Sequence, residues 1–216
     1  MSQELQSDYM VSIYVGKEPR PFQVQRAALV NISDRNPFKD MLDCRKQCNL
    51  QPTGSLYFHQ DDVESWKILL YLIILREWEY GSTVFDRPLL IDCWLLGEKY
   101  GIPDFCDSAM RFLFDSYIWD GQDEPEIEEI KKVFTETQPG SKLGELMADV
   151  LVGMLRYTHQ TATSLCVDQW TSLPGFGAAM VEAHGPRNMD TSSTGTWTGT
   201  GFLGIEEKGR SRGRRS

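Results

Sequence analysis

The first sixty residues alternate apolar and polar side chains in the manner of a small sheet. Residues 11–15, VSIYV, have the period-two pattern of a half-buried strand and end at Gly16. Residues 22–25 are predicted to be its hairpin partner. The intervening KEPRP forms the turn, because its two prolines would deprive a ladder of hydrogen-bond donors. A third strand is predicted over residues 54–59.

Between these strands and after them, the apolar residues have the spacing of helices. Short helices are predicted over 26–31 and from Pro37 to about residue 44, since proline is tolerated at the first helical position. Asp61, with Glu64 three residues on, is predicted to cap a longer helix with apolar residues at helical spacing, namely Val63, Trp66, Leu69, Leu70, Ile73 and Ile74. Most of its opposite face is apolar as well, so it must lie in the middle of a domain or expose part of itself to a partner.

The next two helices are predicted to meet at a tight corner. Residues 89–100 repeat the helical pattern and stop at Gly101, which favours a left-handed backbone, and Pro103 opens a helix that runs to about residue 119. The order is a strand hairpin, short helices, a strand and then a helical run. This order indicates an α+β domain with helices gathered against a small sheet.

A helical extension is predicted over residues 124–160. Its first helix is broken at Pro139, and Ser141 can cap the second. That second helix has the most regular apolar stripe of the chain: Leu143, Leu146, Met147, Val150, Leu151, Met154 and Leu155. The stripe is a single seam, which must pack on the preceding helices or form part of a partner surface.

The composition fits one domain with an extension. The chain has 216 residues, of which 41% are hydrophobic and 25% are charged. Its five cysteines are an odd, sparse set and its N-terminus lacks a signal-peptide pattern, which together favour a reducing intracellular compartment, cytoplasm or nucleus. The longest apolar run, residues 68–75, is far shorter than the about 20 residues of a membrane-spanning helix. No transmembrane segment is expected.

Charge is distributed unevenly along the chain. The net charge is -9, and residues 185–216 carry six Lys/Arg against three Asp/Glu, so +3 lies in this tail and -12 in the remainder. An acidic body disfavours nucleic-acid binding, except weakly through the basic tail. The tail is rich in Ser, Thr and Gly and is predicted to be disordered. Its final GRSRGRRS is either a phosphate-binding or nuclear-import patch or a solvated terminus.

One group of residues could form a catalytic or metal-binding site. Cys44 and Cys48 lie one helical turn apart and His59 follows eleven residues later, which leaves a small thiol- or metal-dependent enzyme as the alternative function. Zinc sites need about four ligands, usually with a Cys-x-x-Cys pair, and none occurs in the sequence. Cys93 and Cys106 fall in apolar helices and are expected in the core. We therefore predict no catalytic residue, no cofactor and no metal.

The succession VSIYVG, FQVQRAAL, NPFKDML, DDVESWKILLYLII and LLIDCWLLGEKYGIPDFCDSAMRFL resembles the BTB/POZ domain, especially its divergent fungal branch. The resemblance covers residues 8–119, and VFTETQPGSKLGELMADVLVGML looks like the helical extension of those proteins. LLGEKYGIPDF is the most specific stretch. The resemblance implies a non-catalytic protein-interaction module that forms dimers or acts as an adaptor in a ubiquitin-ligase or transcription-related complex.

Three departures from the family pattern limit what the resemblance implies. Gln25 stands where the family usually has a histidine. Only ten residues precede Val11, whereas many dimeric relatives exchange a strand and helix placed there. Relatives that hold a cullin scaffold often have an apolar residue, any residue and then Glu in the middle helix, and Ile68 occupies the position of that acid.

Partner contacts are predicted on large apolar residues, since a few such anchors carry most of the binding energy of an interface. The candidates are Trp66, Ile68, Trp78 and Tyr80 on the domain and Met147, Met154 and Leu155 on the extension. The aromatic residues could instead cover the core. The acidic stretch ahead of the extension, Asp120, Asp123, Glu124, Glu126, Glu128 and Glu129, is interpreted as a solvated helix start that complements the helix dipole.

Overall fold

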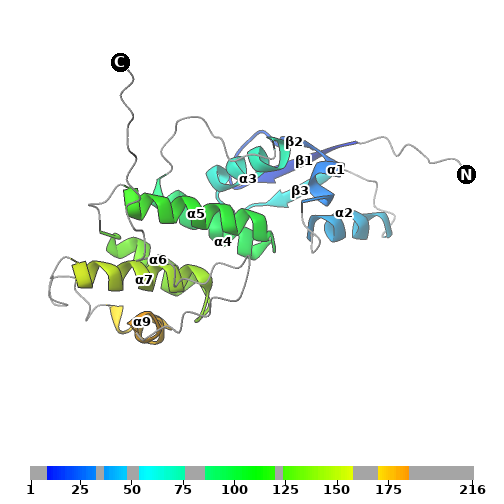
Figure 1. Cartoon of the computed structure of the whole chain (residues 1–216). Helices are drawn as coiled ribbons and strands as arrows, with labels where there is room; N and C mark the ends of the chain where they lie inside the picture. The colour runs from blue at the N-terminus through cyan, green and yellow to red at the C-terminus, as the bar shows by residue number, and fades with distance from the viewer. Residues whose placement is uncertain are drawn as a thin grey trace, which may run out of the picture. The chain divides into compact units, whose positions relative to one another are not determined.

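The computed structural model (Figure 1) describes residues 9–32, 37–47, 54–75, 86–119, 124–157 and 170–184. The chain divides into two compact units, residues 1–138 and residues 139–216. This boundary lies inside the predicted extension, because its first helix packs with the N-terminal unit and its second helix belongs to the C-terminal one. The predicted disordered tail, residues 185–216, lies outside the described residues.

The N-terminal unit contains a three-stranded mixed sheet in the order β2-β1-β3. Strand β1 (Met10–Val15) pairs antiparallel with β2 (Phe22–Gln25) and parallel with β3 (Ser55–Phe58), so all three predicted strands are confirmed. Gly16 has a φ of +54°, a left-handed conformation that lets the chain turn directly after β1. Parallel pairing of β1 with β3 needs a crossover, and α1 (Arg26–Val30) and α2 (Pro37–Gln47) lie within it.

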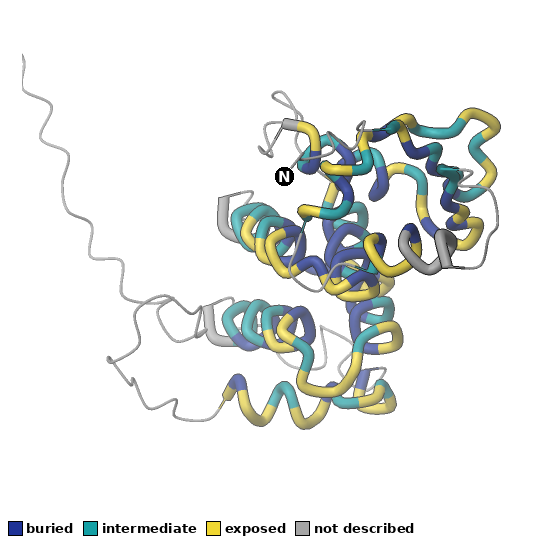
Figure 2. Tube along the Cα trace, turned by 90° about the vertical axis from the view of Figure 1, so that its right-hand side faces the viewer, coloured by how far each residue is buried: buried dark blue, intermediate teal, exposed yellow. Residues whose placement is uncertain are grey.

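Each strand buries alternate residues, as the period-two pattern predicts (Figure 2). The inner face of the sheet carries the half-buried Phe22 and six buried residues, Val11, Ile13, Val15, Val24, Leu56 and Phe58. Phe58 packs against Trp66 with ring centroids 4.5 Å apart, and Phe38 and Tyr100 complete a cluster of four aromatic rings. This cluster joins the sheet to the helices.

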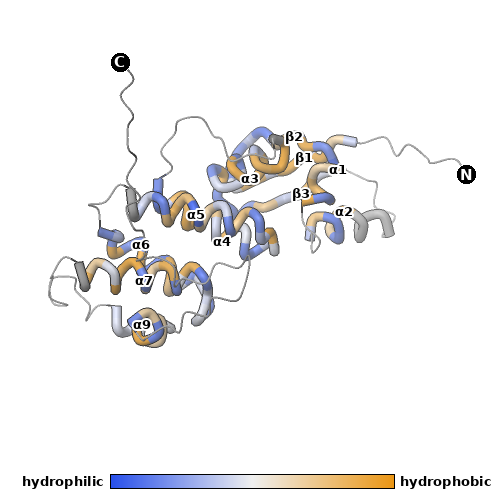
Figure 3. Tube along the Cα trace, viewed as in Figure 1, coloured by the Kyte–Doolittle hydropathy of each residue, from blue (hydrophilic) through white to orange (hydrophobic). Residues whose placement is uncertain are grey.

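Among the described residues of this unit, four more helices follow the sheet: α3 (Val63–Leu75), α4 (Arg87–Lys99), α5 (Pro103–Trp119) and α6 (Ile127–Glu136). Figure 1 places the sheet at the end of this unit remote from α6. Hydrophobic residues run along β1 and α3 (Figure 3), and α3 buries Trp66, Leu69 and Ile73. The small sheet with its gathered helices confirms the predicted α+β class. Within the described residues, no helix is both long and apolar enough to cross a membrane.

The predicted corner between α4 and α5 is confirmed. Two glycines, Gly97 and Gly101, have separate structural roles in it. Gly101 has a φ of +59° and ends α4, while the Ile102 N–H donates to the Gly97 carbonyl over 2.9 Å. A Cβ atom on Gly97 would lie 2.6 Å from the Cys106 Sγ and 3.2 Å from the Cys106 backbone nitrogen. Gly97 is therefore the point at which α4 and α5 approach too closely for any side chain.

We expect Gly97→Ala to lower the free energy of unfolding by about 1–3 kcal/mol, because overpacking forces the two helices apart. The matched control is Gly153→Ala in a helix of the C-terminal unit, where a Cβ atom meets nothing within 4 Å. That substitution should instead stabilise its helix by about 0.5–1 kcal/mol. Urea unfolding of both variants measures the difference, and equal effects would contradict close packing at Gly97.

The C-terminal unit contains α7 (Lys142–Tyr157) and α9 (Phe176–His184). Ala148 and Val152 of α7 form a small buried cluster with Ala183 of α9. The predicted cap is confirmed, since the Gly144 N–H donates to the Ser141 Oγ over 3.1 Å. Helix α9 was not predicted, because its sequence FGAAMVEAH is short and small residues blur its apolar stripe.

Candidate interaction surface

The three strands leave one face of the sheet outside the core. We call this the outer sheet face; its side chains are those of Met10, Ser12, Tyr14, Gln23, Gln25, Ser55 and Tyr57. All seven are partly or fully exposed, and none is an acid or a base. In a chain with 25% charged residues, this uncharged face differs from an ordinary solvated surface. Tyrosine and methionine together with few charges are typical of protein–protein interfaces.

Aromatic rings dominate the β1–β3 side of this face. The rings of Tyr14 and Tyr57 stack with centroids 4.8 Å apart and planes 8° apart. The His59 ring lies 5.7 Å from that of Tyr57. Parallel pairing brings Tyr14 directly opposite Tyr57, so the sheet register creates the stack. Next to it, the Gln23 side chain donates a hydrogen bond of 2.9 Å to the Ser12 hydroxyl.

A buried carboxylate lies between the sheet and helices α3 and α4. Asp61 accepts hydrogen bonds from Trp66 Nε1 over 2.9 Å and from the Tyr100 hydroxyl over 2.6 Å, and it pairs with Lys99 Nζ over 2.6 Å. Its side chain is only 2% exposed, while that of Lys99 is 52% exposed. Burial, followed by the hydrogen bond to Asp61, raises the pKa of Tyr100 well above that of a free phenol. Tyr100 therefore remains a hydrogen-bond donor.

Asp61, Trp66, Lys99 and Tyr100 together form what we call the Asp61 junction. Its hydrogen bonds show that the predicted helix cap is wrong. Asp62, and not Asp61, caps α3, because its Oδ2 accepts from the Ser65 N–H over 2.7 Å and from the Ser65 hydroxyl over 2.9 Å. Asp61 is turned inward by the donors on Trp66 and Tyr100. The sequence identifies an aspartate beside the helix start, but only the packing decides which of two neighbours caps it.

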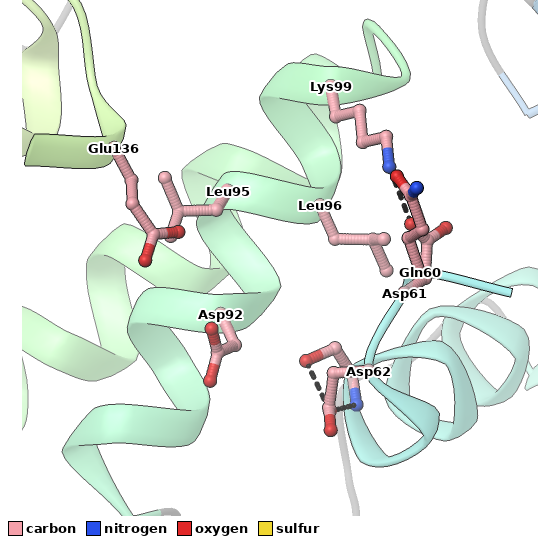
Figure 4. Close-up of a pocket in the computed structure, with 9 residues that line it drawn as sticks. Gln60, Asp61, Asp62, Asp92, Leu95, Leu96, Lys99 and Glu136 are labelled. Carbon is pink, nitrogen blue, oxygen red and sulfur yellow. Dashed lines mark hydrogen bonds and ion pairs between the residues drawn. The ribbon is translucent and has the colours of Figure 1, made fainter. Parts of the chain in front are cut away.

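A hollow of about 150 Å³ borders the Asp61 junction (Figure 4). It is lined by Gln60, Asp61, Asp62, Ser65, Asp92, Leu95, Leu96, Lys99 and Glu136. Three of its four carboxylates have structural partners: Asp61 and Asp62 as described, and Asp92 in an ion pair of 2.5 Å with Lys132. Asp61 links the start of α3 to the end of α4, and Asp92 links α4 to α6. Among the described residues, no group of three or more His, Cys, Asp or Glu is placed to hold a metal ion.

A second buried carboxylate corrects the interpretation of the acidic stretch. Glu129 is buried, and its Oε2 accepts from the Glu126 N–H over 2.9 Å and from the Tyr117 hydroxyl over 3.3 Å. Arg87 Nε lies 3.4 Å from the other oxygen. Glu124, Glu126 and Glu128 are exposed as expected, whereas Asp120 and Asp123 lie outside the described residues. Glu129 thus joins α4, α5 and α6.

Glu129 should make stability depend on pH. Burial raises the pKa of its carboxyl, and the Glu126 N–H, Arg87 and Tyr117 offset this only in part. The folded state then binds the proton more tightly than the unfolded state. Its contribution is therefore fully favourable below the ordinary glutamate pKa and is lost as the pH rises through the raised value.

We expect Glu129→Gln to remove this pH dependence while keeping an acceptor for Tyr117. The unfolding free energy of the wild type should fall relative to that of the variant as the pH rises, by about 1.4 kcal/mol for each unit of pKa elevation. The ion pair with Arg87 forms only when Glu129 is ionised, so its effect is already contained in the pKa of Glu129. Urea titrations at several pH values measure the slope, with the exposed Glu128→Gln as control; parallel profiles for Glu129→Gln and wild type would contradict the prediction.

The residues that were predicted to contact a partner do not all lie at the surface. Trp66 and Ile68 are 0% and 6% exposed, so they pack in the core and cannot present a docking surface on the folded unit. Met147 is likewise buried. Met154 and Leu155 keep partial exposure on α7. Trp78 and Tyr80 lie outside the described residues. The physical reason for the correction is the hydrophobic gain from burying large side chains, which α3 uses for folding.

The thiols also take different positions. Cys93 and Cys106 are buried, as expected of core cysteines, and the Cys106 thiol donates to the Trp94 carbonyl oxygen over 3.6 Å. Burial raises the pKa of the Cys93 thiol to about 12, which suppresses the thiolate that nucleophilic chemistry needs. His59 is exposed beside Tyr57. The side chains of Cys44 and Cys48 lie outside the described residues, so the Cys44/Cys48/His59 group stays a prediction.

Sequence reasoning missed the outer sheet face. The signal was present in the strand pattern itself: the positions that alternate with the apolar ones are Ser, Tyr and Gln, where a solvated strand commonly carries charges. The Tyr14–Tyr57 stack needs the strand order and the register, neither of which follows from a single sequence.

Comparison with known proteins yields no match for this chain, whether against family models, curated proteins or solved structures.

Proposed function

We propose that this chain is a non-catalytic protein–protein interaction module of the BTB/POZ type. It would act as an adaptor in an assembly such as a ubiquitin-ligase or transcription-related complex. The observation that carries the proposal is the outer sheet face, which combines exposed tyrosine and methionine with amide and hydroxyl groups and has no charge. Because this face carries no charge, its desolvation opposes binding only weakly, and its tyrosines offer aromatic anchors.

The order of the elements supports the BTB/POZ part of the proposal. A hairpin, two short helices, a third strand and a run of helices is the succession on which the resemblance rests. Its most specific stretch, LLGEKYGIPDF, serves the fold: Gly97 allows the approach of α5, Lys99 and Tyr100 bind Asp61, and Gly101 ends α4. These residues of the stretch therefore have structural roles in the fold.

The proposal does not extend to a cullin scaffold held through α3. Trp66 and Ile68, the positions that correspond to the family's apolar residue and glutamate, are both buried. The surface we propose is instead formed by the strands. An intracellular location, in cytoplasm or nucleus, is part of the proposal and rests on the five sparse cysteines.

Affinity purification with quantitative mass spectrometry tests this function. The baits are the wild type, Tyr57→Glu on the outer sheet face and Trp78→Ala, one of the contacts predicted from sequence alone. Ile74→Glu is the matched control, because Ile74 is 61% exposed on α3 and the variant adds the same charge elsewhere. We expect partners to be depleted about tenfold with Tyr57→Glu and retained with Ile74→Glu. Identical protein lists from all four baits would overturn the proposal.

A further inference from the structure

We infer that an extended segment of a partner protein adds as a further strand to the free edge of β2. This inference rests on the proposed function and names the mode of binding, in which main-chain hydrogen bonds join the segment to the sheet. The order β2-β1-β3 places β2 at one edge, with β1 on its other side. The segment would therefore continue the sheet beyond Phe22–Gln25.

The register of the sheet shows which backbone groups of β2 point away from β1. The Ser12 N–H donates to the Gly54 carbonyl directly before β3, so the backbone groups of Ser12 face β3. Successive residues of a strand direct these groups to opposite sides, which turns those of Val11 toward β2. Val11 lies opposite Val24, and these two residues therefore exchange ladder hydrogen bonds. The residues on either side of Val24 direct their backbone groups to the open edge.

Three backbone groups are available at this edge: the Gln23 N–H, the Gln23 carbonyl and the Gln25 N–H. The Gln25 carbonyl is at the N-cap of α1, where it accepts the first bond of that helix. Within the described residues, none of the three groups has a hydrogen-bond partner. An extended chain presents matching groups at the same spacing, whereas a helix uses its own N–H and carbonyl groups internally. The edge therefore fits a strand.

The side chains of β2 indicate the composition of the added strand. The sequence of β2, FQVQ, lacks the charges that commonly protect an edge strand from pairing. Phe22 is only half-buried, whereas Val24 on the same face is 2% exposed, so the core is open beside Phe22. An apolar side chain of the added strand can cover Phe22, while its alternate residues lie beside the exposed Gln23 and Gln25. The segment should therefore alternate apolar and polar residues.

Charge favours another protein over a second copy of this chain at the edge of β2. Each chain has a net charge of -9, so two copies repel one another. A neutral or basic segment meets no such repulsion. We therefore expect the partner segment to be extended, alternating in polarity and free of net negative charge.

A proline substitution removes one donor from the edge and leaves the ladder with β1 intact. Gln25 has a φ of -62°, close to the value of about -65° that proline imposes, and its side chain caps no helix. Proline is compatible with an edge strand where the N–H faces away from the sheet. Gln25→Ala is the matched control, because it removes the same side chain and keeps the N–H. Both variants should retain the circular dichroism spectrum of the wild type.

Binding of peptides to the full chain tests the inference. A phage-displayed library of random peptides is selected on the wild type, and the selected peptides are synthesised and measured by fluorescence polarisation. We expect Gln25→Pro to weaken their binding at least about tenfold, because the donor is lost and the proline ring occupies its place, and Gln25→Ala to change it less than about twofold.

A second arm needs no variant of the protein and so holds even if Gln25→Pro fails to fold. The selected peptides are methylated on alternate backbone nitrogens. Methylation of the set that faces β2 should abolish binding, while methylation of the other set should leave it largely unchanged, since those N–H groups point to solvent.

Three results would overturn the inference: no peptide selected on the wild type, equal binding by Gln25→Pro and Gln25→Ala, or equal effects of the two methylation patterns. Its failure is distinguishable from failure of the proposed function. If one of these results is obtained while Tyr57→Glu still loses a protein in the purification experiment, the interaction module stands and strand addition at β2 is excluded.

Discussion

Replacing Asp61 with alanine is expected to lower the free energy of unfolding by about 3–5 kcal/mol. The substitution leaves Trp66 Nε1 and the Tyr100 hydroxyl without their acceptor in the core. Each unsatisfied buried donor costs about 1–3 kcal/mol, whereas Lys99 is half exposed and can return to water. Urea unfolding followed by tryptophan fluorescence and circular dichroism measures the loss.

The neighbouring aspartate is the matched control for this prediction. Asp62→Ala removes only the cap of α3 and should cost about 1 kcal/mol. Tyr100→Phe should cost about 1–2 kcal/mol in the wild type and much less when Asp61 is already alanine, because the two groups share one hydrogen bond. Equal losses for Asp61→Ala and Asp62→Ala, or additive effects in the double variant, would contradict a central role for Asp61.

The second large effect is expected at Trp66. Trp66→Ala should lower the free energy of unfolding by about 3–5 kcal/mol, because it opens a cavity between Phe38, Phe58 and Tyr100. A docking residue would behave differently, since removing an exposed side chain changes stability by about 0.5 kcal/mol or less. Thermal and urea unfolding therefore separate the two interpretations of this residue.

Ile74 is the reference position on the same helix. It is 61% exposed, and Ile74→Ala should leave the stability within about 0.5 kcal/mol of wild type. If Trp66→Ala were as stable as Ile74→Ala while losing a binding partner, Trp66 would belong to a contact surface and the core assignment would be wrong.

Much of the fold could be predicted because local patterns determine it. The period-two run of residues 11–15 and the helix stop at Gly101 act through backbone and side-chain preferences within a few residues. Helix α9 was not predicted, since its nine residues include several small side chains and show no clear apolar stripe. The unit boundary near Pro139 was also missed, because helix periodicity does not say which neighbour a helix packs against.

The candidate surface was less predictable, since it depends on contacts between distant residues. Exposed and buried tryptophans look the same in sequence, and α3 is apolar on nearly all sides. Trp66 lies in the core because its ring packs in the aromatic cluster and its indole N–H donates to Asp61, five residues earlier in the chain. Conversely, Tyr14 and Tyr57 are far apart in the chain and become a single feature only through parallel pairing of β1 and β3.

Site-specific photo-crosslinking tests the central claim most directly. The claim is that the outer sheet face, and not α3, contacts protein. Photoreactive p-benzoylphenylalanine is introduced in place of Tyr57 or in place of Ile74, and the chain is irradiated in the cells that express it. The account predicts discrete protein adducts from position 57, with the crosslinked peptide containing the outer sheet face, and none from position 74. Adducts at position 74 alone, or no adduct at position 57, would contradict it.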